Sequence, residues 1–184
     1  MSSRKSSLRK KLQKRIKRIS SEKRFAKSVK IKRKLLSEAS FIQAKKILCY
    51  MALPTEVETR SLIQAAWRRG KKIYIPRIVQ KEKHMTFYAI HNFSRDVEKG
   101  AYGIEEPKVV SSRRGKAGEM DLVIVPGVAF TKSGARLGRG GGYFDRLLKK
   151  IPAVKIGVAF REQIVKSLPM KPHDVRMDKV VTDS

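Results

Sequence analysis

Apolar residues recur at helical spacing in the first 40 residues of the chain. The first four follow one another at intervals of four, four and three residues, which places them on one face of a helix: Leu8, Leu12, Ile16 and Ile19. Ser20 and Ser21 separate this helix from a second one. The apolar residues of the second helix are Phe25, Val29, Leu35 and Leu36. The pattern predicts two helices, each with one packed face and a basic, solvated remainder.

From Lys46 onward the pattern changes to short apolar runs of strand length. These runs are residues 47–52, 72–76, 85–90, 121–126, 154–160 and 179–182. Helical patterns separate them near residues 59–70, where Thr59 is the expected N-cap and Gly70 the stop, and at 146–150. Strands that alternate with helices predict an α/β fold: a three-layer sandwich with a mostly parallel central sheet and helices on both faces, preceded by the two basic N-terminal helices. We expect one domain over residues 1–184, with residues 1–40 as its basic helical part.

Charge is the most unusual feature of the composition. The chain has 44 Lys and Arg against 16 Asp and Glu, a formal net charge of +28. Such an excess predicts attraction to polyanions, whether nucleic acid, anionic membrane or phosphorylated and polycarboxylate small molecules. A hydrophobic content of 41% argues against intrinsic disorder. No apolar run approaches the roughly 20 residues that a membrane-spanning helix needs, and we expect a cytoplasmic protein.

Cysteine and histidine chemistry is sparse. The single cysteine, Cys49, excludes an internal disulfide and a Cys-cluster zinc site. It lies in an apolar run, which favours a buried core thiol over a nucleophile. His84, His91 and His173 show no metal-ligand spacing.

One decapeptide carries the strongest chemical signal, Arg136-Leu-Gly-Arg-Gly-Gly-Gly-Tyr-Phe-Asp145. It lies between a strand-like and a helix-like run, a layout that lets backbone N–H groups converge on a phosphate. It supplies Arg136 and Arg139 as phosphate partners and Asp145 as an oxygen ligand for Mg²⁺. It is neither a Walker A loop nor a Rossmann fingerprint. A flexible surface turn is the alternative, although so many glycines are costly without a conformational reason.

This decapeptide and the run 121–130 before it resemble the 5-formyltetrahydrofolate cyclo-ligase family, and further matches follow the same order along nearly the whole chain. They are Lys5-Ser-Ser-Leu-Arg9, Leu53-Pro-Thr-Glu-Val-Glu-Thr59, Tyr74-Ile-Pro-Arg77, Gly103-Ile-Glu-Glu-Pro107, and His173-Asp174 with Asp178 and Thr182. The resemblance implies ATP- and Mg²⁺-dependent ring closure of 5-formyltetrahydrofolate to 5,10-methenyltetrahydrofolate, with release of ADP and phosphate. ATP would activate the formyl oxygen, and N10 would then attack. No covalent nucleophile is needed for such a reaction.

The resemblance also implies roles for individual residues. The ATP-binding set is Lys5, Arg9, Arg136, Gly138, Arg139, Gly140, Gly141, Gly142, Tyr143 and Phe144. The substrate-binding set is Met51, Glu56 and Tyr143, the catalytic pair is Arg139 and Tyr143, and the Mg²⁺ ligands are Asp145 and Asp174. Without the resemblance each residue has a plainer interpretation: solvated cations for Lys5 and Arg9, a first-turn helix carboxylate for Asp145, a turn residue for Asp174, a loop glutamate for Glu56, core packing for Met51.

Two positions depart from the family pattern. The family commonly has Lys where this chain has Gly141, and Tyr where it has Phe144. Loss of that cation keeps open a folate- or nucleotide-binding protein without turnover, and the net charge keeps open a nucleic-acid-binding protein. We expect a monomer whose partners are ATP and 5-formyltetrahydrofolate, with a polyglutamylated form among the candidates, and nonspecific polyanion binding through the basic surface.

Overall fold

The central feature of the fold is a six-stranded sheet. The computed structural model describes residues 2–100 and 103–184. The strand order is β10-β9-β6-β1-β2-β3, and every neighbouring pair is parallel except the antiparallel hairpin of β2 and β3. The strand bounds are β1 Lys46–Leu48, β2 Lys72–Val79, β3 His84–Ile90, β6 Leu122–Val125, β9 Val154–Ala159 and β10 Lys179–Thr182. The prediction of a mostly parallel sheet is confirmed.

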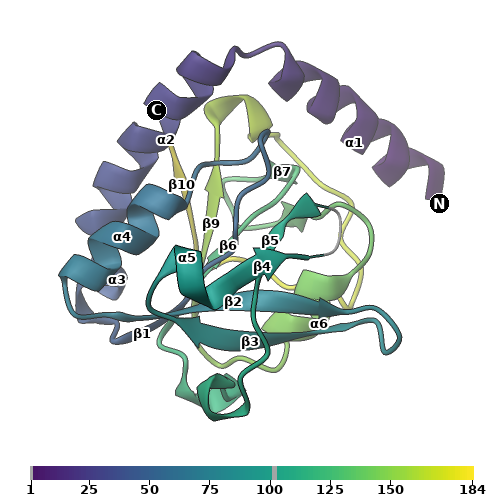
Figure 1. Ribbon diagram of the computed structural model, residues 1–184. Coiled ribbons are helices and arrows are strands. Elements are labelled where there is room, and N and C mark those ends of the chain that lie inside the picture. Colours follow the sequence, from purple (N-terminus) through teal and green to yellow (C-terminus); the bar gives the residue numbers. More distant parts are fainter. Residues whose placement is uncertain (1, 101–102) are drawn as a thin grey trace.

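Helices cover both faces of this sheet, as the sequence predicts. Figure 1 shows α2 (Ser21–Leu36), α3 (Ala39–Gln43) and α4 (Arg60–Arg68) together on one side. The opposite face is covered by α6 (Tyr143–Leu148), whose Leu147 and Leu148 join a second apolar cluster. The first helix, α1 (Ser2–Lys17), extends away from α2 and contacts the short helical turn η4 (Arg161–Gln163). Within the described residues no helix is long and apolar enough to cross a membrane.

Strand β6 illustrates why the core has two halves. All four of its side chains are buried, and they alternate between the two clusters: Leu122 and Ile124 with the α2–α4 side, Val123 and Val125 with the α6 side. Side chains on successive strand residues point to opposite faces, so a strand buried on both faces has to be apolar throughout. The uninterrupted apolar run is therefore a clear sequence signal for β6.

The N-terminal helices differ in part from the expected packing. Ser20 caps α2 by accepting a hydrogen bond from the backbone N–H of Lys23 at 3.3 Å. Leu12 and Ile16 of α1 are buried, as predicted. Phe25 was expected on the packed face of α2, but that prediction is wrong: its side chain is 59% exposed, because the buried face of the helix runs through Ser28, Ile31 and Leu35.

Several boundaries also differ from the predicted ranges. β1 ends at Leu48, four residues earlier than expected, and residues 49–53 continue as irregular chain before the turn at 54–55. Thr59 is the N-cap of α4, but its hydroxyl donates to the carbonyl of Tyr50 at 2.7 Å instead of capping the helix. α6 begins at Tyr143, directly after the glycine loop. The sequence did not reveal these small elements: α5 (Phe93–Asp96), β4 (Val97–Lys99), β5 (Glu105–Pro107), β7 (Ala129–Phe130), β8 (Arg136–Leu137), η2 (Ser111–Arg113) and η3 (Ala117–Glu119).

Cys49 lies at the end of β1, on the α2–α4 side of the sheet. It is 1% exposed, and burial raises the pKa of its thiol well above its ordinary value. The thiol is therefore protonated at neutral pH and is not a nucleophile. This agrees with the core role predicted from the sequence.

A charged cluster ties α2 to the end of the sheet. Lys27 forms ion pairs with Asp183 at 2.6 Å and with Glu162 at 2.9 Å. Burial alone would raise the pKa of both carboxyls, but the hydrogen bonds from Lys27 outweigh it, so the pKa of each lies below its ordinary value. Their folded-state pKa values are depressed, so the stabilisation is present above the unfolded pKa near 4 and is lost as pH falls through the folded values.

Lys27→Met is therefore expected to lower the free energy of unfolding by about 2–3 kcal/mol at pH 7, because two largely buried carboxylates lose their cation. The loss should shrink below about pH 4, where the carboxylates are protonated. Urea unfolding at both pH values measures it. Lys30→Met is the control, since Lys30 is an exposed lysine of the same helix. Equal losses for the two variants would contradict the account.

Candidate active site

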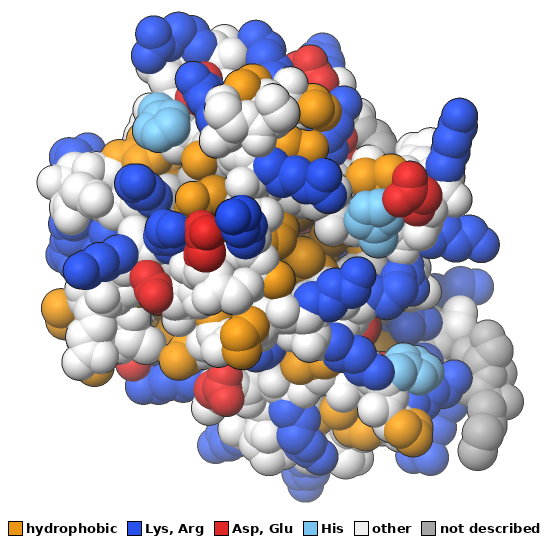
Figure 2. Space-filling model, turned by 90° about the horizontal axis from the view of Figure 1, so that it is seen from below, with side chains coloured by type: hydrophobic (Ala, Val, Ile, Leu, Met, Phe, Trp, Pro, Cys, Tyr) orange, Lys and Arg blue, Asp and Glu red, His pale blue; other side chains and the backbone are white. Residues whose placement is uncertain are grey.

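A cavity of about 850 Å³ opens beyond the carboxyl ends of β1 and β6. Parallel α/β sheets bind ligands at this edge. α1, the hairpin of β2 and β3, and the glycine loop at 138–142 complete its walls. Figure 2 shows one face of the molecule, with Lys and Arg side chains spread over it and a central hollow where hydrophobic side chains are visible. All residues for which the sequence predicts a binding, catalytic or metal role line this one cavity.

The glycine loop connects β8 to α6. Gly140 has φ 122° and Gly142, the N-cap of α6, has φ 68°, both in the region that side chains with a Cβ rarely adopt. A Cβ on Gly142 would also lie 2.7 Å from the guanidinium of Arg146. These two glycines are therefore required by the backbone, and an ordinary surface turn does not account for them.

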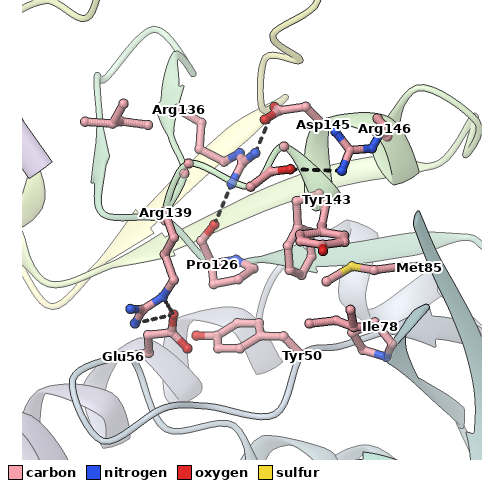
Figure 3. A pocket seen from close by; sticks show the side chains of 18 of the residues that line it. Tyr50, Glu56, Ile78, Met85, Pro126, Arg136, Arg139, Tyr143, Asp145 and Arg146 are labelled. Atoms are coloured by element: carbon pink, nitrogen blue, oxygen red, sulfur yellow. Dashed lines mark hydrogen bonds and ion pairs between the residues drawn. The ribbon is translucent and has the colours of Figure 1, made fainter. Parts of the chain in front are cut away.

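Arg136 lies beneath this loop and is almost fully buried. It donates to Asp145 Oδ1 at 2.8 Å and to the carbonyl oxygen of Pro126 at 3.1 Å (Figure 3). Its Nε has no hydrogen-bond partner among the described residues. Only 3% of the Arg136 side chain and 17% of the Asp145 side chain are exposed. The pair fixes Asp145 at the start of α6, facing the cavity.

Two basic side chains of α1 contact the glycine loop and the nearby Asp174. Lys5 Nζ lies 2.8 Å from Asp174 Oδ2, and Arg9 Nε donates to the carbonyl oxygen of Gly138 at 2.8 Å. Burial alone would raise the pKa of Asp174, but hydrogen bonds from Lys5 and from the backbone of Lys171 lower it below its ordinary value. Asp174 is therefore ionised at neutral pH.

Glu56 and Arg139 face each other across the cavity. Nε and Nη2 of Arg139 each lie 3.0 Å from Glu56 Oε1, and Glu56 Oε2 accepts from the backbone N–H of Leu53 at 3.0 Å (Figure 3). Glu56 is 12% exposed in its side chain, whereas Arg139 is 47% exposed. Glu56 is thus oriented by its own loop, and Arg139 is the more exposed partner.

Apolar side chains form a slot next to this ion pair. Figure 3 shows Tyr50, Ile78, Met85 and Tyr143 around it. Tyr50 is fixed by a hydrogen bond from its hydroxyl to the carbonyl of Val57 at 2.8 Å. Met51 and Phe144 also line the cavity. A flat apolar ring system fits such a slot, with Glu56 at its end as a hydrogen-bond acceptor.

Sequence reasoning missed several lining residues. Tyr50, Ile78 and Met85 resemble ordinary strand residues in the sequence. The pattern of apolar and polar positions around them does not indicate a cavity. Arg146 donates to Gly141 O at 2.9 Å and to Lys83 O at 2.7 Å, and its guanidinium lies 5.1 Å from the centre of the Tyr143 ring. It therefore ties the glycine loop to the turn between β2 and β3. Its place in the Tyr-Phe-Asp-Arg run was the only available signal.

A model of the 5-formyltetrahydrofolate cyclo-ligase family matches residues 1–183. The chain belongs to this family. It is 30% identical to mouse 5-formyltetrahydrofolate cyclo-ligase over 98% of this chain and 94% of the mouse protein. It is 34% identical to the Haemophilus influenzae enzyme of the same name, over 72% and 73% of the two chains.

The fold of the cyclo-ligase family is likewise seen in solved structures. The NMR structure of Aquifex aeolicus 5,10-methenyltetrahydrofolate synthetase superposes with a TM-score of 0.86 at 34% identity. It covers 97% of this chain and 89% of that one. The resemblance that the sequence motifs indicate is therefore confirmed at the level of family and fold.

Proposed function

We propose that this protein is an ATP-dependent 5-formyltetrahydrofolate cyclo-ligase that forms 5,10-methenyltetrahydrofolate, ADP and phosphate. One observation carries the proposal: a glycine loop with convergent cations and an apolar slot ending in Glu56 share a single cavity. The relatives named above are cyclo-ligases or methenyltetrahydrofolate synthetases, and they support the same activity.

The nucleotide belongs at the glycine loop. Gly140, Gly141 and Gly142 line the cavity, and Lys5 and Arg9 border it from α1. A triphosphate is stabilised by such a combination of backbone donors and fixed cations. Lys5 would exchange its contact with Asp174 for a phosphate oxygen. Arg136 is buried, so it supports the loop and Asp145 from beneath.

The folate belongs in the apolar slot. A pterin ring would lie among Tyr50, Ile78, Met85 and Tyr143, with its N–H groups donating to Glu56. Glu56 has its geometry set by Leu53 N–H before any ligand arrives. Arg139, at the border between the two halves of the cavity, is placed to contact either the phosphate or the folate.

The residues of the cavity fit Mg²⁺ that arrives with the nucleotide. Among the described residues no group of three or more His, Cys, Asp or Glu side chains is arranged to hold a metal ion alone. Mg²⁺ is usually bound by one or two carboxylates together with phosphate oxygens, so such a cluster is not required. Asp145 and Asp174 would hold it, and the ion would neutralise charge on the phosphates during transfer.

The chemistry then depends on positioning. The formyl oxygen on N5 attacks the γ-phosphorus of ATP and ADP leaves, which gives a phosphorylated imidate. N10 attacks the activated carbon and loses its proton, the carbon–oxygen bond breaks, and phosphate leaves with the former formyl oxygen. The cations of the loop and α1 neutralise the transferring phosphoryl group, and the slot excludes water from the imidate.

The activity is tested by mixing the purified protein with 5-formyltetrahydrofolate, ATP and Mg²⁺ and following the near-ultraviolet absorbance of the methenyl product. Product should form only with ATP present. Absence of ATP-dependent product from folded protein would leave a binding protein without turnover.

Substitutions at Gly141 test a separate prediction, which concerns the affinity for ATP. A Cβ at this position would lie 2.7 Å from the Tyr143 ring, so any side chain there displaces the ring. Gly141→Ala isolates this steric effect, and Gly141→Lys adds the cation common in the family. We expect Gly141→Lys to bind ATP about three- to tenfold more tightly than Gly141→Ala, by about 1 kcal/mol of added charge attraction. Calorimetry that shows equal affinities would contradict this.

Further parts of the proposal concern the whole chain. We propose that residues 1–184 act as one domain, as a monomer in the cytoplasm. The basic exterior would attract polyglutamylated folates and, nonspecifically, other polyanions. The six-stranded sheet shared by both apolar clusters supports one domain, and the net charge of +28 supports the attraction of polyanions.

A further inference from the structure

The ion pair between Arg139 and Glu56 joins the two halves of the cavity. Arg139 belongs to the glycine loop, whereas Glu56 lies between β1 and α4, at the end of the apolar slot. Figure 3 shows the guanidinium of Arg139 next to the carboxylate of Glu56. The pair of Lys5 and Asp174 differs from it, because both of its members lie on the nucleotide side. The Arg139–Glu56 pair therefore connects the site of one substrate to the site of the other.

This pair occupies the acceptor that the folate needs. Arg139 Nε and Nη2 each lie 3.0 Å from Glu56 Oε1, and Glu56 Oε2 accepts from the backbone N–H of Leu53 at 3.0 Å. A carboxylate oxygen has about two lone-pair sites for donors, so two nitrogens at this distance leave Oε1 without a free site. A pterin that donates two N–H groups to Glu56 therefore has to displace Arg139.

The same pair withholds a cation from the nucleotide. The guanidinium of Arg139 contacts Glu56 and forms no ion pair with another carboxylate in the described part of the chain. Its side chain is 47% exposed, and its neighbours in the chain are Gly138 and Gly140, which line the cavity. A guanidinium released from Glu56 therefore stays beside the expected place of the triphosphate, where it can donate charge-assisted hydrogen bonds to phosphate oxygens. Phosphate and Glu56 compete for one side chain.

We propose that the Arg139–Glu56 ion pair couples the two substrates, so that binding of either one promotes binding of the other. This inference rests on the proposed function. When folate binds first, Glu56 accepts from the pterin, and Arg139 is released to the phosphate site. When ATP binds first, Arg139 contacts the phosphates, and Glu56 Oε1 is free for the pterin. The first ligand breaks the pair, and the second ligand binds a site in which the pair is already broken.

The strength of the ion pair sets the size of this coupling. Breaking an ion pair with one partly exposed partner changes the population of the open site by about fivefold. Coupling between two binding sites is reciprocal, so ATP and folate have to raise each other's affinity by the same factor. We therefore expect each ligand to bind about fivefold more tightly when the other is saturating.

The test is calorimetric binding of a non-hydrolysable ATP analogue with Mg²⁺, in the presence and absence of saturating 5-formyltetrahydrofolate. The wild type should bind the analogue about fivefold more tightly when folate is present, and Arg139→Met should abolish this difference. Without nucleotide, Arg139→Met should bind folate about fivefold more tightly than the wild type, because no side chain then competes for Glu56. A role of Arg139 in holding the folate directly would produce the opposite change.

Lys5→Met is the matched control, because it also removes a cation that is ion-paired across the cavity. Lys5 and its partner Asp174 both belong to the nucleotide side, so their contact does not connect the two substrates. The variant should bind the ATP analogue more weakly both with and without folate. The ratio of the two affinities should stay that of the wild type.

Any of three results refutes the coupling through this pair: independent binding of the two ligands to the wild type, undiminished coupling in Arg139→Met, or folate binding by that variant that is no tighter than in the wild type. These outcomes are distinct from failure of the proposed function. Coupled binding without methenyl product would refute the turnover alone, and independent binding in a protein that forms the product would refute the coupling alone. A folded wild type that binds neither ligand would refute both.

Discussion

Asp145→Asn is expected to lower kcat by on the order of 10²-fold or more, while the protein stays folded. Asp145 is the carboxylate that links the two parts of the nucleotide site. Its Oδ1 neutralises the buried Arg136, and its position at the start of α6 faces the cavity beside the glycine loop. The amide keeps the shape of the side chain but removes the charge that would hold Mg²⁺ with the phosphates. Steady-state kinetics at increasing Mg²⁺ concentration measures both kcat and the metal requirement.

Asp178→Asn separates this effect from loss of a structural carboxylate. Asp178 Oδ2 accepts from the backbone N–H of Lys155 at 2.7 Å, at the start of β9 and outside the cavity. We expect this variant to be less stable and to keep the wild-type kcat and Mg²⁺ dependence. Wild-type kcat in folded Asp145→Asn would refute the role given to Asp145.

Glu56→Gln is expected to weaken 5-formyltetrahydrofolate binding by about 10- to 100-fold. A hydrogen bond to a charged group contributes roughly 1.5–3 kcal/mol, and each 1.4 kcal/mol is a factor of ten. Glutamine preserves the side-chain length and can still accept from Leu53 N–H, so the loop keeps its conformation. The variant also releases Arg139 from its ion pair, so ATP should bind at least as tightly as in the wild type.

Glu58→Gln is the matched control for this prediction. Glu58 lies two residues away and accepts hydrogen bonds from Ser61 at the start of α4, and it does not line the cavity. Its substitution should affect stability alone. Calorimetry with folate and with ATP distinguishes the two variants. Folate affinity that is equal in both variants would show that Glu56 is not a ligand-binding residue.

Much of the fold was accessible from the sequence because its strands are buried on both faces. Runs such as 122–125 are apolar throughout, and Gly70 stops α4 with φ 70°, as its position indicates. The order of the strands was not accessible, since β1 lies between β6 and β2 through crossovers that no local pattern encodes. The exposed Phe25 was misassigned because both possible faces of α2 contain apolar residues.

The candidate site likewise has parts that the local sequence predicts and parts that it does not. The glycine loop is contiguous, and its residue types carry their own chemical meaning. The ion pairs that organise the cavity are not contiguous: Lys5 and Asp174 are 169 residues apart, and Glu56 and Arg139 are 83 apart. Ile78 and Met85 enter the site because the hairpin of β2 and β3 lies at the edge of the sheet next to α6. Such placement depends on tertiary packing and leaves no signal in the local sequence.

The central claim is that ATP activates the formyl oxygen of 5-formyltetrahydrofolate in this cavity. It is tested most directly with substrate that carries ¹⁸O in the formyl group, by mass analysis of the phosphate released while the methenyl product forms. The account predicts one ¹⁸O atom in each phosphate, because the oxygen leaves with the phosphoryl group. Methenyl product accompanied by unlabelled phosphate would contradict it.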